Sequence, residues 1–334
     1  MNPQRCQIAG LGKFLPERRV SAEETDALAG LEPGWTIKHS GVHSRYFAAV
    51  HETASWMGAR AAERALAQAG LSPGDVDGIV CASGTMQQPV PCTAALMQRE
   101  LGPAFAGVPS FDINATCLSF VVALDHLAPV VASGRYRNLL LISSELASPG
   151  IDWSHPESCT ILGDGAAAAV IRPTPAGESS AVLASGLETW AEAASLTEIR
   201  GGGTGIPGSR HDGSNTGDYL FRMEGKAVFR FASGRLPAFT ARLLGAAGLR
   251  GWEDLKLVIP HQGSLMAMRL LRKRLGIPEE RFFVHAQDGA NTIAATIPIG
   301  LHDAWAQGRI GRGDRIALMG TSAGLSIGGV ILEL

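Results

Sequence analysis

The sequence predicts an α/β fold built from two similar halves. Short apolar runs rich in β-branched residues alternate with longer helix-like segments, and one series of motifs occurs twice in the same order. The length of 334 residues suits two packed domains or one large α/β unit. Apolar residues make up 46% of the chain and charged residues only 18%, which is enough apolar material for a large buried interior.

The first half alternates strand-like and helix-like segments. Its strands are expected at four apolar runs, namely 77–84, 109–114, 138–145 and 166–173. Its two clearest helices are expected at 51–70 and 117–134. Strands that are apolar throughout and separated by helices imply a mostly parallel sheet that is covered on both faces.

Three stretches of this half are echoed in the second half. The pairs are AGLSPGDVDGIV (69–80) with AGLRGWEDLKLVI (247–259), ASGRYRNLLLISS (132–144) with AQGRIGRGDRIALMG (306–320) and, more weakly, GDGAAAAVI (163–171) with GLSIGGVIL (324–332). Three matches in one order indicate a duplicated α/β unit. We expect the halves to span 1–175 and 176–334. The Gly- and Ser-rich segment 191–219 is expected to be irregular, either a plain surface connection or a mobile lid.

Composition argues against several classes of protein. The net charge is near −2 without a long block of one sign, which argues against a nucleic-acid surface. Five widely spaced cysteines with no CxxC pair argue against a disulfide framework and a structural zinc site. No apolar run is long enough for a signal-peptide core or a membrane span, so we expect a cytoplasmic protein without a membrane partner.

Cys117 stands where a strand-like run gives way to a helix. PSFDIN (109–114) precedes it, and the helix-like segment 117–134 begins with it. Packing is one explanation, because free cysteine is among the most buried residue types. The other is a nucleophile, since a helix N-terminus stabilises a thiolate and offers N–H groups to an oxyanion. The other four cysteines lack this setting.

A cysteine nucleophile usually has a histidine partner, and His261 has the best position among nine histidines. It follows the apolar strand LKLVIP and precedes a helix. Asn291 follows a strand expected at FFVHAQ (282–287) and opens the helix-like NTIAATIPIGLHDAW. Taken singly, His261 fits a structural histidine and Asn291 an ordinary N-cap. With Cys117, however, both would lie at strand carboxyl ends, where ligands collect in doubly wound sheets.

The motifs around these three residues are DINATCLSF, IPHQGS and DGANTIAAT. In this order and spacing they resemble the Cys, His and Asn motifs of the thiolase-superfamily β-ketoacyl-ACP synthases, most closely synthase III. Further stretches fall in the family's order: WTIKHSGVHSRYF (35–47), HETASWMG (51–58), LGDGAAAAVI (162–171), MEGKAVFR (223–230) and GTSAGLSIGG (320–329). The resemblance implies a thiolase-like fold, with duplicated βαβαβ halves in a five-layer αβαβα arrangement, usually as a homodimer.

The resemblance also implies a mechanism. Cys117 would take an acyl group from a thioester, while backbone N–H groups of Cys117 and of the turn near Ala323 hold the oxyanion. His261 and Asn291 would donate hydrogen bonds to the thioester oxygen of a malonyl donor as CO₂ leaves. The resulting carbanion equivalent would attack the acyl-Cys117 carbonyl. The resemblance implies no metal or redox cofactor, and its expected partners are acyl carrier protein and coenzyme A thioesters.

Departures from the family pattern concern how the substrates are held. Trp35, Val90 and Gly324 occupy substrate-binding positions of the family. Where synthase III has an arginine that grips the CoA adenine, this chain has His39, and the second stacking arginine has no counterpart in 152–161. A standard CoA-adenine clamp is therefore not expected, and the acyl group would arrive on a carrier protein or sit differently.

A basic patch for the carrier protein is partly kept. Arg230, Lys273 and Arg274 match positions of that patch, whereas Met266 replaces a family arginine. For Lys273 and Arg274 a solvated helix face is the alternative explanation.

Val90 falls where acetyl-specific relatives carry a phenylalanine that blocks the acyl channel. The smaller valine predicts a primer longer than acetyl. It also argues against the family branch that joins two long acyl chains, which carries a glutamate at or near this position.

Two other functions remain open at this point. The same Cys117 acyl-enzyme could pass its acyl group to a hydroxyl, amine or aromatic acceptor. A non-catalytic thiolase-fold partner subunit is the alternative from another class, and the intact Cys–His–Asn set argues against it.

Overall fold

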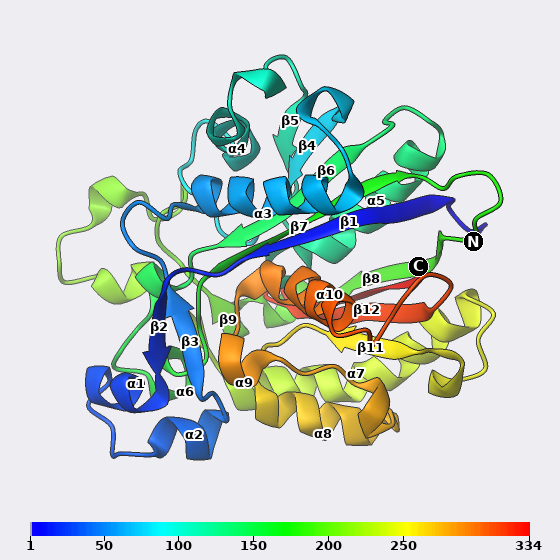
Figure 1. The fold of residues 1–334 in the computed structure, drawn as a ribbon. Coiled ribbons are helices and arrows are strands. Elements are labelled where there is room, and N and C mark those ends of the chain that lie inside the picture. Colours follow the sequence, from blue (N-terminus) through cyan, green and yellow to red (C-terminus); the bar gives the residue numbers. More distant parts are fainter. Residues whose placement is uncertain (1) are drawn as a thin grey trace.

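Two β-sheets form the frame of the molecule, for which the computed structural model describes residues 2–334 (Figure 1). The first sheet has the strand order β1-β7-β6-β4-β5. Its strands are β1 (Cys6–Phe14), β4 (Gly78–Cys81), β5 (Ser110–Asp112), β6 (Leu139–Glu145) and β7 (Gly165–Pro173). The second sheet has the order β11-β12-β13-β8. Its strands are β8 (Ala181–Thr189), β11 (Leu257–Pro260), β12 (Arg315–Ser322) and β13 (Ser326–Glu333).

Both sheets are mixed, whereas the sequence predicted a mostly parallel arrangement. In the first sheet β4 runs parallel to β5 and β6, but β7 runs antiparallel to β6 and β1. The reason lies in the connection between β6 and β7, whose only helical pieces are η4 (Ser148–Gly150) and α6 (Pro156–Cys159). A parallel return usually needs a full crossover helix, so here the chain turns back antiparallel.

Helices cover both sheets and fill the space between them (Figure 1). On the outer side of the first sheet lie α3 (Ala54–Ala69) and α4 (Thr93–Leu101), and α3 packs on β1, β7 and β6. Between the sheets lie α5 (Ser119–Ala132) and α10 (Thr296–Ala306), and α5 contacts strands of both sheets. On the far side of the second sheet lie α7 (Gly225–Ala246) and α8 (Leu265–Leu275). The predicted five-layer αβαβα arrangement is confirmed.

The central layer carries the main hydrophobic core. In α5, Phe120, Leu124 and Val131 are fully or almost fully buried, and they join side chains of both sheets in one cluster. A helix that is apolar on nearly every side suits a position between two sheets. This packing fixes the start of α5, and therefore Cys117 just before it.

The two sheets repeat one strand order, as the internal echo predicted. Strands β8, β13, β12 and β11 take the places of β1, β7, β6 and β4. At the place of β5, the second sheet has a single parallel bridge between Val258 and Phe282. The prediction of a strand at 282–287 is therefore wrong, because α9 (Ala286–Gly289) occupies the end of that segment. The division of the chain at residue 175 stays a prediction.

Smaller elements surround one end of the layers (Figure 1). They are β2 (Arg18–Ser21), α1 (Ala22–Leu28), α2 (Trp35–Ser40) and β3 (Ser44–Phe47). The segment expected to be irregular, 191–219, holds only short 3₁₀ turns and β9 (Thr197–Glu198), which pairs with β10 (Arg222–Met223). All five cysteines are free. Within the described chain, no helix combines the length and apolarity needed to cross a bilayer.

Gly12 shows how tightly α3 lies on β1, and it yields a stability prediction. A Cβ at Gly12 would lie 2.0 Å from the carbonyl oxygen of Ala61, so Gly12→Ala must push the helix and strand apart. Overpacking of this kind costs about 1–3 kcal/mol. We expect that loss in the free energy of unfolding, measured by urea denaturation. Gly74→Ala is the control, since its Cβ would meet no atom within 4 Å; equal losses in both variants would contradict the prediction.

Candidate functional site

Cys117 lies in a tight turn, η3 (Thr116–Leu118), which leads into α5. Thr116 has a left-handed backbone, with φ of 50°, which is rare for a β-branched residue. Its hydroxyl donates to the carbonyl of Ala323 at 3.2 Å, and its N–H donates to the side chain of Asn114 at 2.8 Å. These bonds hold Cys117 against the turn between β12 and β13. The helix itself begins at Ser119, two residues later than the sequence predicted.

The surroundings of Cys117 favour a neutral thiol at rest. Burial raises the pKa of Cys117 to about 12, and the charge of Glu145 acts in the same direction. Backbone hydrogen bonds from the N–H groups of Ala323 and of Cys117 itself act in the opposite direction. The expected helix-stabilised thiolate is therefore not the resting form, because Cys117 lies outside the first turn of α5. The two N–H groups are the pair expected to hold an oxyanion.

His261 follows β11 and is almost fully buried. Its Nδ1 lies 2.8 Å from the hydroxyl oxygen of Thr296, at the start of α10. Burial lowers the pKa of His261 to about 4, helped by nearby His285 and opposed by the carbonyl of Ile293. The imidazole is therefore neutral near pH 7. Gly320 makes room for it, because a Cβ at Gly320 would lie 2.5 Å from that of His261.

Asn291 is held by its backbone and by one end of its side chain. Its N–H donates to the carbonyl of Ile161 at 2.7 Å, and its Oδ1 accepts from the N–H of Ile293 at 2.9 Å. The amide nitrogen thus keeps its N–H groups for a ligand. Asn291 is not the expected helix N-cap: Thr292 caps η10 (Ile293–Ala295), and α10 begins only at Thr296.

The segments of these three residues meet around Gly84. A Cβ on Gly84 would lie 2.8 Å from the side chain of Ile293 and 3.2 Å from the backbone of Thr116, so only glycine fits. His261 joins the same group through Thr296, whose hydroxyl donates to the carbonyl of Ile293 at 2.9 Å. The predicted convergence of the Cys, His and Asn segments is therefore present in the fold.

Glu145, which sequence reasoning missed, lies at the same junction. Its carboxylate accepts hydrogen bonds from Gly84, Thr85 and Ala294. The sequence does hold one signal for Glu145 as a site residue. It ends the apolar run NLLLISSE with a charge at the carboxyl end of a strand.

The predicted substrate-binding residues lie in more open positions. Trp35 begins α2 and stacks on His39, with ring centroids 4.2 Å apart. Val90 is 80% exposed and does not line the cavity described below. Gly324 lies in the turn between β12 and β13, with φ of 130°.

The predicted docking residues are on the surface. Arg230 lies on α7, and Lys273 and Arg274 lie near the end of α8; all three are exposed. Met266, at the start of α8, is 56% exposed. The end of α2 lies against Leu265, at the start of α8.

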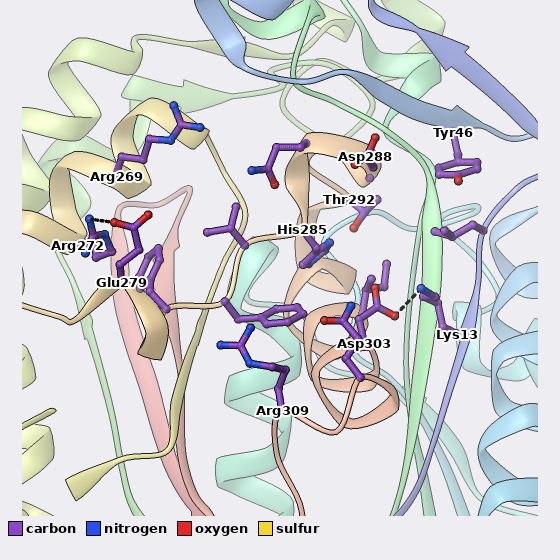
Figure 2. A pocket seen from close by; sticks show the side chains of 18 of the residues that line it. Lys13, Tyr46, Arg269, Arg272, Glu279, His285, Asp288, Thr292, Asp303 and Arg309 are labelled. Atoms are coloured by element: carbon purple, nitrogen blue, oxygen red, sulfur yellow. Dashed lines mark hydrogen bonds and ion pairs between the residues drawn. The ribbon is translucent and has the colours of Figure 1, made fainter. Parts of the chain in front are cut away.

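A cavity of about 770 Å³ lies on the other side of the Asn291 segment (Figure 2). Thr292 and His285 form its floor, and Lys13, Arg269 and Arg309 stand around it. None of Cys117, His261 and Asn291 lines it. It is therefore not the site of acyl transfer. Elsewhere in residues 2–334 no group of three His, Cys, Asp or Glu side chains is arranged to hold a metal ion.

Comparisons with known proteins show the family to which this chain belongs. The model described as 3-oxoacyl-[acyl-carrier-protein (ACP)] synthase III matches residues 111–190, and that of its C-terminal part matches 244–334. The β-ketoacyl-[acyl-carrier-protein] synthase III of Aquifex aeolicus (strain VF5) is 34% identical over 98% of this chain and 99% of its own. That of Rhodobacter capsulatus is 35% identical with the same coverage. The chain belongs to the β-ketoacyl-ACP synthase III family.

Solved structures agree with this membership. The crystal structure of the Aquifex aeolicus VF5 synthase III has a TM-score of 0.87 at 32% identity, covering 98% of this chain and all of that one. The priming β-ketosynthase of the R1128 polyketide pathway has a TM-score of 0.89 at 28% identity, covering 99% and 97%. The thiolase-like fold predicted from the motifs is confirmed, and the chain is an acyltransferase of the condensing class.

The lowered pKa of His261 predicts a loss of stability in acid. Between the ordinary value of 6.5 and about 4, the unfolded chain binds a proton at this residue that the folded protein does not. The free energy of unfolding should therefore fall as the pH falls through that window, by about 2–3 kcal/mol from His261. Urea unfolding at about pH 7 and pH 4.5 measures it, and His261→Gln should lose less than the natural protein. Identical losses would count against a buried neutral imidazole.

Proposed function

We propose that this protein joins an acyl group, carried on Cys117, to a malonyl thioester with loss of CO₂. One observation supports this above all: the turns of Cys117 and Asn291 pack together around Gly84, and His261 joins them through Thr296. The thiol of Cys117 and the imidazole of His261 are both neutral there, and the amide of Asn291 keeps its N–H groups for a ligand. The reaction needs a nucleophile and uncharged donors in a dry site.

In the first step Cys117 attacks the carbonyl of an acyl thioester. The N–H groups of Cys117 and Ala323, both of which act to lower the pKa of the thiol, hydrogen-bond the tetrahedral oxyanion. When the intermediate collapses, the thiol proton goes to the departing thiolate of the donor. An acyl-enzyme and a free thiol remain.

In the second step the malonyl thioester occupies the space beside the acyl-enzyme. His261 and Asn291 donate hydrogen bonds to its thioester oxygen, on which negative charge grows as the C–C bond to CO₂ breaks. A neutral imidazole has one N–H, and this role places it on Nε2, so that Nδ1 is an acceptor. The Thr296 hydroxyl, 2.8 Å from Nδ1, then donates its one hydrogen to the ring and gives up its bond to the carbonyl of Ile293. The carbanion equivalent then attacks the acyl carbonyl, the C–S bond breaks, and Cys117 leaves as a thiolate that takes a proton from solvent to return as a thiol.

Surface charge favours acyl carrier protein as the bearer of the malonyl group. Arg230, Lys273 and Arg274 are exposed cations without an ion-pair partner in residues 2–334, and they suit an acidic carrier. His39 stacks on Trp35 where the family places an arginine for the CoA adenine. We infer that CoA is gripped more weakly here than in typical relatives. The reaction proposed needs no metal or redox cofactor and takes place in the cytoplasm.

The acyl group is proposed to be longer than acetyl, and a homodimer is proposed to complete its channel. Val90 is an apolar side chain on an exposed loop, 80% accessible in a single chain. From this exposed position, Val90 would bound the acyl channel of the partner subunit and not that of its own chain.

Coupled product analysis tests the proposed function. The protein is incubated with an acyl thioester and malonyl-ACP labelled in the carboxyl carbon. Equal amounts of CO₂ and β-ketoacyl-ACP support condensation. Transfer of the acyl group to another acceptor without CO₂, or no transfer at all, would refute it.

The two steps should respond differently to substitution. His261→Ala and Asn291→Ala should still form the acyl-enzyme, because neither residue touches the first oxyanion. Each should lower the rate of malonyl decarboxylation about 10²–10³-fold, the usual effect of losing one such donor. Rapid-quench measurement of both half-reactions separates them. A variant that loses acylation as severely as decarboxylation would contradict the assigned roles.

Chain-length preference should depend on position 90. Val90→Phe should lower the rate of acylation with hexanoyl to decanoyl thioesters relative to acetyl, because the larger ring fills the channel. The control is Val50→Phe, at another fully exposed valine on the surface. If acetyl is already the fastest donor of the natural protein, or if Val90→Phe leaves the preference unchanged, the inference about Val90 is wrong.

A further inference from the structure

Glu145 ends β6 with a side chain that has no exposed surface. Its Oε1 accepts from the N–H groups of Gly84 at 2.6 Å and of Ala294 at 3.3 Å. Its Oε2 accepts from the N–H of Thr85 at 3.0 Å and from the hydroxyl of Thr85 at 2.5 Å. No Lys, Arg or His of residues 2–334 forms an ion pair with it.

This cage is built for an anion. Three of the four donors are backbone N–H groups, which cannot reverse their role, and both oxygens receive at least one of them. A glutamine side chain has only one oxygen, so its NH₂ group would face one of these N–H donors without an acceptor. Burial of an unpaired charge opposes the hydrogen bonds and raises the pKa of Glu145 to about 7. A buried group of this kind beside a nucleophile is a candidate for a functional role.

The carboxylate also joins the two turns of the site. Gly84, bound to Oε1, is wedged between the turn of Cys117 and Ile293. Ala294, bound to the same oxygen, lies three residues after Asn291. The reach of the charge extends to Cys117 itself, whose pKa it raises.

We propose that Glu145 is a positioning residue of this site: its carboxylate fixes the Asn291 turn against the Cys117 turn, and its unpaired charge adds to burial in disfavouring the thiolate of Cys117 until an acyl thioester arrives. This rests on the proposed role of Cys117 as the acylated nucleophile. A thiolate formed beside this charge is high in energy and strongly nucleophilic, since thiolate nucleophilicity rises with pKa. The resting thiol is shielded from stray electrophiles.

Few other titratable groups face Glu145. Cys117 on η3 and Cys81 on β4 both feel its charge. Asp164, before β7, has its oxygens bound to Ala48, Ala147 and Ser148. The remaining charged groups of the elements packed on β6 reach solvent: Arg60, Glu63 and Arg64 on α3, Asp125 and His126 on α5, and Arg172 on β7. Glu145 is therefore the group that titrates beside Cys117 near neutral pH.

Alkylation of Cys117 tests the proposal without any substrate. The rate with iodoacetamide is measured between about pH 6 and pH 9.5, and peptide mass spectrometry separates Cys117 from the other partly accessible cysteine, Cys92. In the natural protein, log rate against pH should flatten near pH 7, where Glu145 gains its charge and opposes thiolate formation. In Glu145→Gln it should rise with unit slope throughout, and the rate at pH 8 should be about tenfold or more above the natural one.

Two further variants separate charge from packing. Glu145→Asp keeps the charge but cannot reach all four donors, so the alkylation profile should persist while malonyl decarboxylation slows. Ser144→Ala removes a neighbouring buried bond, from its hydroxyl to the carbonyl of Ala54 at 2.7 Å, and should leave the profile unchanged.

A Glu145→Gln profile that matches the natural one, or an equal change in Ser144→Ala, overturns the proposal. Should Glu145→Gln not fold, a unit slope throughout in the natural protein overturns it equally. Failure of condensation alone would leave the alkylation profile intact, so the two proposals fail separately.

Discussion

The close approach of two turns across Gly84 is the constraint on which the rest of the site depends. One turn comes from the first half and carries Cys117, and the other comes from the second half and carries Asn291. Between them there is no space for a Cβ. The left-handed backbone of Thr116 and of Ile293, with φ of 50° and 48°, lets both turns come this near. The layers of sheet and helix serve to hold these strained turns in place.

Burial decides the chemistry available once the turns have met. Because burial disfavours their charged forms, Cys117 stays a thiol and His261 stays a neutral imidazole, as the directions of their pKa values require. Neutral donors suit a reaction in which negative charge appears on a thioester oxygen and then disappears. The carboxylate of Glu145, buried beside these residues, is surrounded by backbone N–H groups and the Thr85 hydroxyl instead of a cation. The site is thus organised by fixed dipoles, which need no rearrangement as charge moves.

Much of this arrangement was predictable from local patterns. Four strands of the first half, the duplicated order of the sheets and the convergence of Cys117, His261 and Asn291 follow from apolar runs, an internal echo and recognisable motifs, whereas β1 was not predicted. What failed depends on long-range contacts. The helix of Cys117 starts at Ser119 because Thr116 bonds to a turn two hundred residues away. The run 282–287 has strand-like composition, yet its pairing with the sheet edge is limited to the bridge of Phe282 with Val258, where the N–H of Phe283 donates to the Val258 carbonyl.

Glu145 illustrates the limit most clearly. Its neighbours in sequence show a strand ending in a charge, which is ordinary at a surface. Its four donors come from loops sixty and about one hundred and fifty residues away, so only the fold reveals that the charge is buried and unpaired. Val90 is a related case, since a single chain leaves it exposed and a second copy is needed to give it a role.

Intact-protein mass spectrometry after exposure to a panel of acyl-CoA and acyl-ACP donors tests the central claim most directly. The account predicts the mass of one acyl group per chain, on the peptide that contains Cys117, absent from Cys117→Ser and cleared when malonyl-ACP is added. No adduct with any donor, or an adduct on a cysteine other than Cys117, would contradict it.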